Sequence, residues 1–274
     1  MIAKQFAGVL ALVLGSAVPG GAAECVVAGV PATPADTARA RTACEVARAR
    51  FAELFGDPVP NVRVILQDRA GYRAGIQGVT ATILWPTTRA MEARVGRGAA
   101  ARKHIEEQWR DVLPHEITHA LLAVRFDGAW TEPTSGGYAT PFPDWFDEGV
   151  AIRAESIENR RARLAQARAL PAARRDLLSI VTSRHPAQAD ARLLAIRDGA
   201  APPPDRALWD FYPQAIAVLE FVFQKGGQAA IRELAARYVA DPNDPDALAG
   251  LPGLPSTLEG VVAAWEEWIS GAGT

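Results

Sequence analysis

Residues 115–119 read HEITH, and residues 143–151 read PDWFDEGVA. In the first stretch two histidines stand four residues apart. On a helix they lie one turn apart on the same face, so both imidazoles can reach one ion. Glu116 then lies beside that ion, placed to take a proton from a water molecule. His115 and His119 are therefore predicted metal ligands and Glu116 a catalytic base, although two ordinary helical histidines would have the same spacing.

The surroundings of HEITH predict a helix over residues 100–126. Apolar residues recur every three to five positions along this segment, from Ile105 to Val124. This spacing buries one face of a helix. Pro114 lacks a backbone N–H, so it must either kink the helix or begin a second one.

A catalytic zinc ion needs a third protein ligand and leaves its fourth position for water. The pattern HExxHxxGxxH would supply that ligand close by, but Leu122 and Arg125 occupy its Gly and His positions. Glu148 is the alternative, in a helix predicted to begin near Asp144. The Gly- and Pro-rich loop at 127–143 lets the chain turn back toward HEITH. Acidic residues are also common in the first turn of a helix without any metal.

Together the two stretches resemble the gluzincin zinc peptidases, the aminopeptidase-like and thermolysin-like superfamily, whose second motif W-x-x-E-G-x-A matches residues 145–151. The resemblance implies one zinc ion per chain, held by His115, His119 and Glu148, with Glu116 as the base. In that group a further Glu lies seven residues after the third ligand, and Glu155 occupies this place. Glu155 would orient a ligand imidazole; a solvated helix face is the alternative.

The resemblance also implies a catalytic Tyr, because in this superfamily one follows the third ligand at about the separation of Tyr212 from Glu148. It would donate a hydrogen bond to the charge that develops on the carbonyl oxygen. Pro213 is expected to start a helix and to hold Tyr212 extended before it. A core aromatic is the alternative reading of Tyr212. The remaining histidines, His104 and His185, are expected on the surface.

The chain departs from the superfamily in two ways. Pro114 directly precedes the first ligand, and no G-x-M-E-N motif for binding a substrate's amino terminus is present. An endopeptidase, or a peptidase with a narrow substrate, therefore fits as well as an aminopeptidase. A substrate peptide is expected to pair with an exposed edge strand, for which residues 79–85 are the candidate, with a buried core strand as the alternative.

The first 23 residues have the three parts of a secretory signal: Lys4, an apolar run over 6–18, and small residues at 20–23. No other stretch is long and apolar enough to cross a bilayer. The chain is therefore expected in the periplasm or outside the cell. In such an oxidising compartment Cys25 and Cys44 are expected to form a disulfide, with two free thiols as the alternative.

The pattern of elements predicts an α+β, zincin-like fold in a single domain over residues 24–274. A small α/β sublobe (24–126) would carry a short sheet and the active-site helix, and an all-helical sublobe (144–274) would follow. Helices are predicted at 35–55, 144–168, 171–182, 187–197, 213–224, 227–240 and 256–269, and strands at 62–66 and 79–85.

Composition excludes some functions. The 274 residues carry a net charge of only −2, which gives no electrostatic reason to expect nucleic acid as a partner. A peptide or protein substrate is expected instead. The alternative is a non-catalytic periplasmic or secreted interaction protein on a metallopeptidase scaffold. Glu116 argues against that alternative, because a purely structural metal site has no use for its carboxylate.

Overall fold

The computed structural model describes residues 24–29, 32–69, 71–77, 80–126, 140–183, 185 and 206–271. The predicted signal peptide, residues 1–23, lies outside the described residues, and so does the helix predicted at 187–197.

The N-terminal half contains a four-stranded sheet in the order β1-β2-β4-β3. Its strands are β1 (Cys25–Gly29), β2 (Asn61–Gln67), β3 (Arg73–Gln77) and β4 (Thr80–Pro86). β1, β2 and β4 run parallel, whereas β3 pairs antiparallel with β4 at the edge. In β2 the buried side chains of Val62, Val64 and Leu66 alternate with more exposed ones, as expected for a strand covered on one face.

Three helices belong to this half: α1 (Pro34–Phe55) packs against β1 and β2, α2 (Thr88–Val95) contacts β4, and α3 (Ala99–Glu107) packs against α2. Thr33 caps α1 by accepting a hydrogen bond from the backbone N–H of Asp36. The buried Asp36 carboxylate in turn accepts from the backbone N–H of Thr88, the first residue of α2. This contact joins the starts of the two helices.

The predicted helix at 100–126 is continuous but changes its geometry before Pro114. α3 passes into a π-helical turn, η1 (Gln108–Val112), and then into α4 (Leu113–Phe126). The N–H of Leu113 bonds to the carbonyl of Gln108, five residues back. Such π-turns often occur at functional sites. Here the wider turn comes just before Pro114, which has no backbone N–H to donate. The helical segment therefore continues past the proline.

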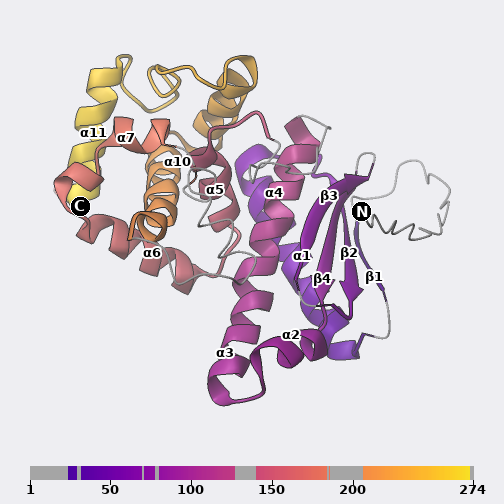
Figure 1. Cartoon of the computed structure of the whole chain (residues 1–274). Coiled ribbons are helices and arrows are strands. Elements are labelled where there is room, and N and C mark those ends of the chain that lie inside the picture. Colours follow the sequence, from indigo (N-terminus) through magenta and orange to yellow (C-terminus); the bar gives the residue numbers. More distant parts are fainter. Residues whose placement is uncertain are drawn as a thin grey trace, which may run out of the picture.

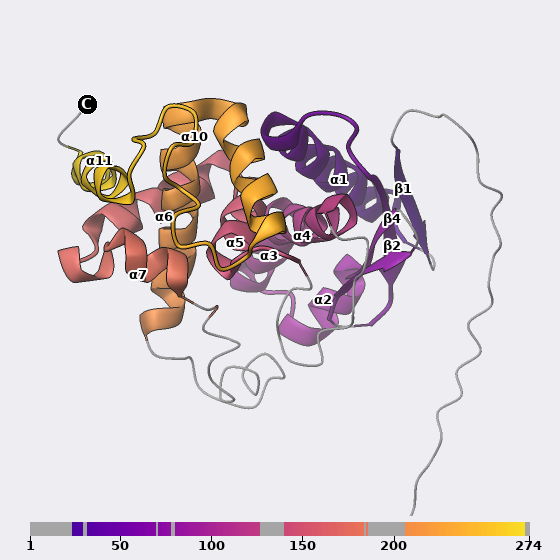
Figure 2. The ribbon, with the colours of Figure 1, turned by 90° about the horizontal axis from the view of Figure 1, so that it is seen from above.

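The C-terminal half is mostly helical (Figures 1 and 2). It contains α5 (Asp144–Ile152), α6 (Ile157–Ala169), the 3₁₀ turn η2 (Ala172–Arg174), α7 (Leu177–Thr182), α10 (Arg206–Ala240) and α11 (Leu258–Ser270). α4 lies between the two halves: it packs against β3, β4 and α1 on one side and against α5 on the other (Figure 1). α10 packs against α5, α6 and α1.

The predicted fold class, α+β with a small sheet followed by a helical part, is confirmed. Three details were wrong. The strand expected at the sheet edge is β4, which pairs on both sides, and the edge strands are β1 and β3. The helix predicted at 144–168 breaks after Ile152. α10 begins at Arg206, so Tyr212 and Pro213 both lie inside a helix. The break expected between the helices at 213–224 and 227–240 is only a kink at Gly227, which has a φ of 62°.

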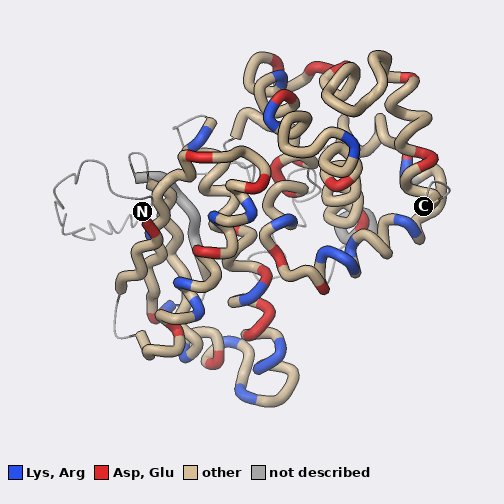
Figure 3. The backbone as a smooth tube through the Cα atoms, turned by 180° about the vertical axis from the view of Figure 1, so that it is seen from behind, with Lys and Arg blue, Asp and Glu red and all other residues tan. Residues whose placement is uncertain are grey.

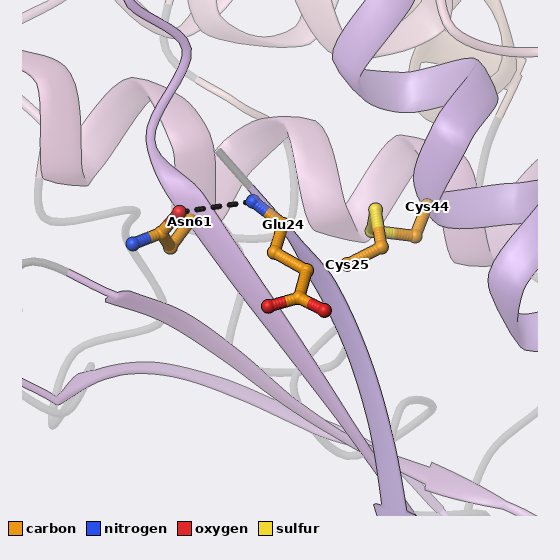
Figure 4. The surroundings of a disulfide bond; sticks show 4 residues. All are labelled: Glu24, Cys25, Cys44 and Asn61. Atoms are coloured by element: carbon orange, nitrogen blue, oxygen red, sulfur yellow. Dashed lines mark hydrogen bonds between the residues drawn. A yellow bond between two sulfur atoms is a disulfide. The ribbon is translucent and has the colours of Figure 1, made fainter. Parts of the chain in front are cut away.

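The predicted disulfide between Cys25 and Cys44 is present and joins β1 to α1 (Figure 4). The backbone N–H of Glu24 also donates to Oδ1 of Asn61, 3.0 Å away, at the start of β2. Cys44 is fully buried in the core, where α1 covers the sheet. The disulfide therefore anchors an edge strand to a core helix.

Charged side chains of both signs are interspersed over the described chain (Figure 3). Among the described residues, no helix combines the length and the apolar character needed to cross a bilayer.

Loss of the disulfide should destabilise the protein. Replacing both cysteines by serine frees a loop whose ends are 19 residues apart, and a loop of this size predicts a loss of about 3 kcal/mol. Urea unfolding of the Cys25→Ser/Cys44→Ser variant would measure the change, and the wild type in reductant should match the variant. An unchanged unfolding free energy in both samples would contradict the proposed anchoring.

Candidate metal centre

α4 carries both histidines into the interior of the molecule. Every side chain from Leu113 to Ala123 is buried, because the sheet covers one side of the helix and α5 the other. His119 is fully enclosed and His115 is 7% exposed. The i, i+4 spacing places their rings together, with centroids 4.7 Å apart.

α5 brings Glu148 to the same point. Its carboxylate is fully buried, in a helix that packs closely against α10. The next residue explains how the two helices approach: a Cβ atom on Gly149 would lie 2.8 Å from the carbonyl oxygen of Ala215 and 3.1 Å from Cβ of Leu219. Glycine after Glu148 therefore serves helix packing, and through it the position of the carboxylate.

The ligand atoms of His115, His119 and Glu148 all lie within 4.8 Å of one another. The two Nε2 atoms are 3.0 Å apart, and the Glu148 oxygens lie 3.3 Å from Nε2 of His115 and 3.8 Å from Nε2 of His119. A tetrahedral zinc ion with ligand bonds of about 2.0–2.1 Å separates its ligand atoms by about 3.3 Å. The three groups therefore fit one zinc ion with only small adjustments.

Glu148 supplies an independent argument for a cation. Neither of its carboxylate oxygens makes a hydrogen bond to any residue that the structure describes, although both are buried. A buried carboxylate without hydrogen bonds is strongly unfavourable unless a positive charge compensates it. A bound metal ion would supply that charge.

Carboxylates hold both imidazoles from behind. Oε1 of Glu155 lies 3.1 Å from Nδ1 of His115, and Oδ1 of Asp147 lies 2.5 Å from Nδ1 of His119. Thr140 donates a hydrogen bond to the other Asp147 oxygen. Carboxylates in this position fix the ring orientation and direct Nε2 at a metal ion.

The same contacts shift the pKa values of the ligands. Burial opposes a charge on His115, but the carboxylates of Glu148 and Glu155 outweigh it and raise its pKa to about 10. Burial likewise opposes a charge on His119, but Asp147 raises its pKa above the usual value. Burial would raise the pKa of Glu148, but the adjacent imidazoles of His115 and His119 lower it to about 2. The metal-free centre therefore holds protons that an incoming metal ion must displace.

Glu116 is 8% exposed and lies next to Tyr72, the residue before β3. The negative charge of Glu116, then burial, raises the pKa of the Tyr72 hydroxyl well above its usual value. The ring of Tyr72 packs on Trp85 of β4, with centroids 5.0 Å apart, and the residue is 42% exposed. Tyr72 thus brings a neutral hydroxyl from the edge of the sheet to the candidate base.

Tyr212 and His185 form a second pair of polar side chains at the site. The Tyr212 hydroxyl is 3.1 Å from Nε2 of His185, which is itself 3.5 Å from Oε1 of Glu148. Burial, reinforced by the charges of Glu148 and Glu116, raises the pKa of Tyr212. Burial lowers the pKa of His185. Both side chains are therefore neutral near pH 7 and can donate hydrogen bonds.

The structure brings together His115, Glu116, His119, Glu148 and Tyr212, and it places Glu155 against a ligand imidazole. Glu155 lies in the bend after α5, where the helix predicted at 144–168 is interrupted. His104 is exposed, as predicted.

The expectation that His185 lies on the surface was wrong. It is 4% exposed, because its backbone N–H bonds to Asp144 and its ring packs edge-to-face on Phe211. Sequence reasoning also missed Asp147 and Tyr72. Asp147 could have been suspected from the sequence, because it adjoins Glu148 in the motif. Tyr72 and His185 could not, because they reach the site only through packing between distant segments.

Comparison with protein-family models, with curated proteins and with solved structures finds no match to this chain. The buried cluster of His115, His119 and Glu148, which could hold one metal ion, therefore rests on the residues and their geometry.

Zinc binding should strengthen as the pH rises. His115 has a pKa of about 10 and His119 a raised pKa, so zinc must displace protons near neutral pH. Each proton released increases the apparent affinity about tenfold per pH unit, until the ligand's own pKa is passed. Competition with a zinc chelator between about pH 6 and pH 9 would measure this. An affinity independent of pH, after correction for the chelator, would contradict the protonated ligands.

Replacing Gly149 by alanine should push α5 away from α10. Because the new Cβ would meet backbone, we expect a loss of about 1–3 kcal/mol in unfolding free energy and weaker zinc binding. Gly98→Ala is a control, since its Cβ would meet nothing within 4 Å, and it should lose less than about 1 kcal/mol. Equal effects of the two substitutions, measured by urea unfolding, would show that close packing at Gly149 is unimportant.

Proposed function

We propose that this protein is a zinc-dependent peptidase of the gluzincin kind, with one zinc ion per chain, exported to the periplasm or out of the cell. One observation carries the proposal most strongly. A buried Glu148 carboxylate without hydrogen bonds to the described residues faces two imidazoles whose Nδ1 atoms are both held by carboxylates. This arrangement is suited to a metal with two nitrogen ligands and one oxygen ligand.

A second acidic residue distinguishes this site from a storage or structural site. Glu116 adjoins His115 in the sequence and is not among the candidate ligands. A structural zinc site is normally closed by a fourth protein ligand, often Cys. Both cysteines of this chain are joined in the disulfide. A zinc ion held by His115, His119 and Glu148 would keep a fourth position for water.

Zinc bound here would supply Lewis acidity, lowering the pKa of a water molecule and polarising a substrate carbonyl. Glu116 accepts the proton of the attacking water and later passes it to the departing amine. Tyr212, with His185 beside it, donates a hydrogen bond to the negative charge that develops on the carbonyl oxygen. Each of these side chains acts from a different element, so the assembled fold is required for the reaction.

The edge strand gives the substrate a place to bind. β3 is terminal in the sheet order, runs antiparallel to β4 and lies against α4. An extended peptide that adds to β3 would gain backbone hydrogen bonds along the sheet. Its carbonyl groups would then run past the side of α4 that carries Glu116. We therefore favour a peptide or protein substrate bound in extended form.

Glu116→Gln should keep zinc and lose hydrolysis, because the amide has the shape of the carboxylate but cannot accept the proton. We expect turnover of quenched fluorogenic peptides to fall by about 10²–10⁴-fold with a zinc content of one per chain. Glu107→Gln, on the half-exposed end of α3, should retain full activity. The same assay with aminoacyl-coumarin substrates separates aminopeptidase from endopeptidase activity.

Near-normal turnover in Glu116→Gln would remove Glu116 from the role of base. A wild-type protein that binds one zinc ion yet cleaves none of these substrates would favour the alternative, an interaction protein on a metallopeptidase scaffold.

A further inference from the structure

Arg163 of α6 forms two hydrogen bonds to the carboxylate that holds His115. Its Nε atom lies 2.9 Å from Oε2 of Glu155 and its Nη2 atom 3.1 Å from Oε1. Oε1 of Glu155 is also the atom that lies 3.1 Å from Nδ1 of His115. Paired contacts of this kind fix a carboxylate in both position and plane. Arg163 thereby determines how Glu155 meets the imidazole.

The same guanidinium group also reaches the other side of the site. Its Cζ atom lies 5.3 Å from the centre of the Tyr212 ring, within the range of a cation–π contact. The hydroxyl of that ring is 3.1 Å from His185, which is 3.5 Å from Glu148. Arg163 is therefore linked to the candidate metal ligands in two ways. One link runs through Glu155 to His115, and the other runs through Tyr212 and His185 to Glu148.

These contacts close a ring around the metal position. Its members, in order, are Arg163, Glu155, His115, Glu148, His185 and Tyr212. The Arg163 side chain is 26% exposed, whereas those of Glu155, His115, Glu148 and His185 are at most 10% exposed, so Arg163 lies toward the outside of the ring. The Glu155 side chain is only 4% exposed and depends on neighbouring donors for its charge.

Few other groups could replace Arg163. Asn159 donates one hydrogen bond, of 2.6 Å, to Oε2 of Glu155, whereas Arg163 binds both carboxylate oxygens. A lysine at position 163 would carry a compact charge without the planar, paired donors. It could not bind both carboxylate oxygens and cover the Tyr212 ring at the same time.

We propose that Arg163 is a positioning residue that holds Glu155 against the His115 imidazole and, at the same time, the Tyr212 ring in place above the site. The inference rests on the metal centre of the proposed function and adds a link between a ligand and the candidate hydrogen-bond donor. Arg163 acts through these two neighbours and contacts no reacting group itself.

The contact of Arg163 with Glu155 is tested by zinc affinity, measured by competition with a chelator, which requires no substrate. Arg163→Met keeps an unbranched apolar stem of similar reach to Nε but removes the guanidinium donors. It should bind zinc about 10–100-fold more weakly than the wild type, the usual effect of losing a group that supports a ligand. Arg163→Lys should show a smaller loss. Arg161→Met, at an exposed position of the same helix, should bind like the wild type.

Chemical rescue separates positioning from general destabilisation. Arg163→Ala should lose affinity to the same extent, and guanidinium at low millimolar concentration should restore part of it, because the partly exposed position can admit the free ion. Arg163→Met should respond less than Arg163→Ala, since its longer side chain occupies part of the space that the free ion would take. Unfolding curves of the metal-free variants report whether each protein is folded.

The contact of Arg163 with the Tyr212 ring is tested by NMR. The ring resonances of Tyr212 are observed in tyrosine-labelled protein and assigned with Tyr212→Phe. They should move in metal-free Arg163→Met and stay in place in Arg161→Met. Wild-type zinc affinity in Arg163→Met would overturn the proposal while leaving the metal centre intact. If that variant does not fold, Arg163→Lys decides in the same way. A wild-type protein that binds no zinc would overturn the proposed function itself, and this inference with it.

Discussion

Carboxylates hold both imidazoles of α4 by their Nδ1 atoms, and this constraint determines what the rest of the site can do. Asp147 and Glu155 turn the two Nε2 atoms toward Glu148, so three potential ligands face one point. Such a concentration of buried acidic groups is unfavourable by itself. Protons on the histidines offset part of the charge in the metal-free protein. A divalent cation would offset more of it, which is why the arrangement favours metal binding.

The fold supplies these groups from two directions. α4 rests on the sheet and on α1, whereas α5 rests on α10 and is brought close to it at Gly149. The π-turn before Pro114 adds a connection, since Asp111 within it accepts a hydrogen bond of 2.9 Å from the backbone of Ser156, next to Glu155. The turn that carries Glu155 is thus held in two places. Ser156 binds the π-turn that precedes α4, and Glu155 binds Arg163 of α6. The two halves of the molecule meet at the candidate ligands.

Features that depend on short spacings could be predicted from the sequence. The i, i+4 spacing in HEITH places His115 and His119 by helix geometry, and Glu148 was expected from the resemblance of residues 145–151. The structure brings the three together. The Cys25–Cys44 disulfide followed from composition and compartment. Features set by contacts between distant segments could not be predicted. β3 lacks a clear alternating pattern, and the burial of His185 depends on Asp144 and Phe211. Tyr212 was expected before a helix because Pro213 follows it, but α10 tolerates that proline in its interior.

The most direct test is a crystal structure of the zinc-loaded protein with anomalous data collected at the zinc edge. The account predicts one strong peak per chain, about 2.0–2.2 Å from Nε2 of His115, Nε2 of His119 and a carboxylate oxygen of Glu148, with the fourth position held by solvent. No peak at this point, or a peak whose ligands exclude Glu148, would contradict it. In that case protonated imidazoles alone would compensate the buried carboxylate, and the proposed chemistry would lose its basis.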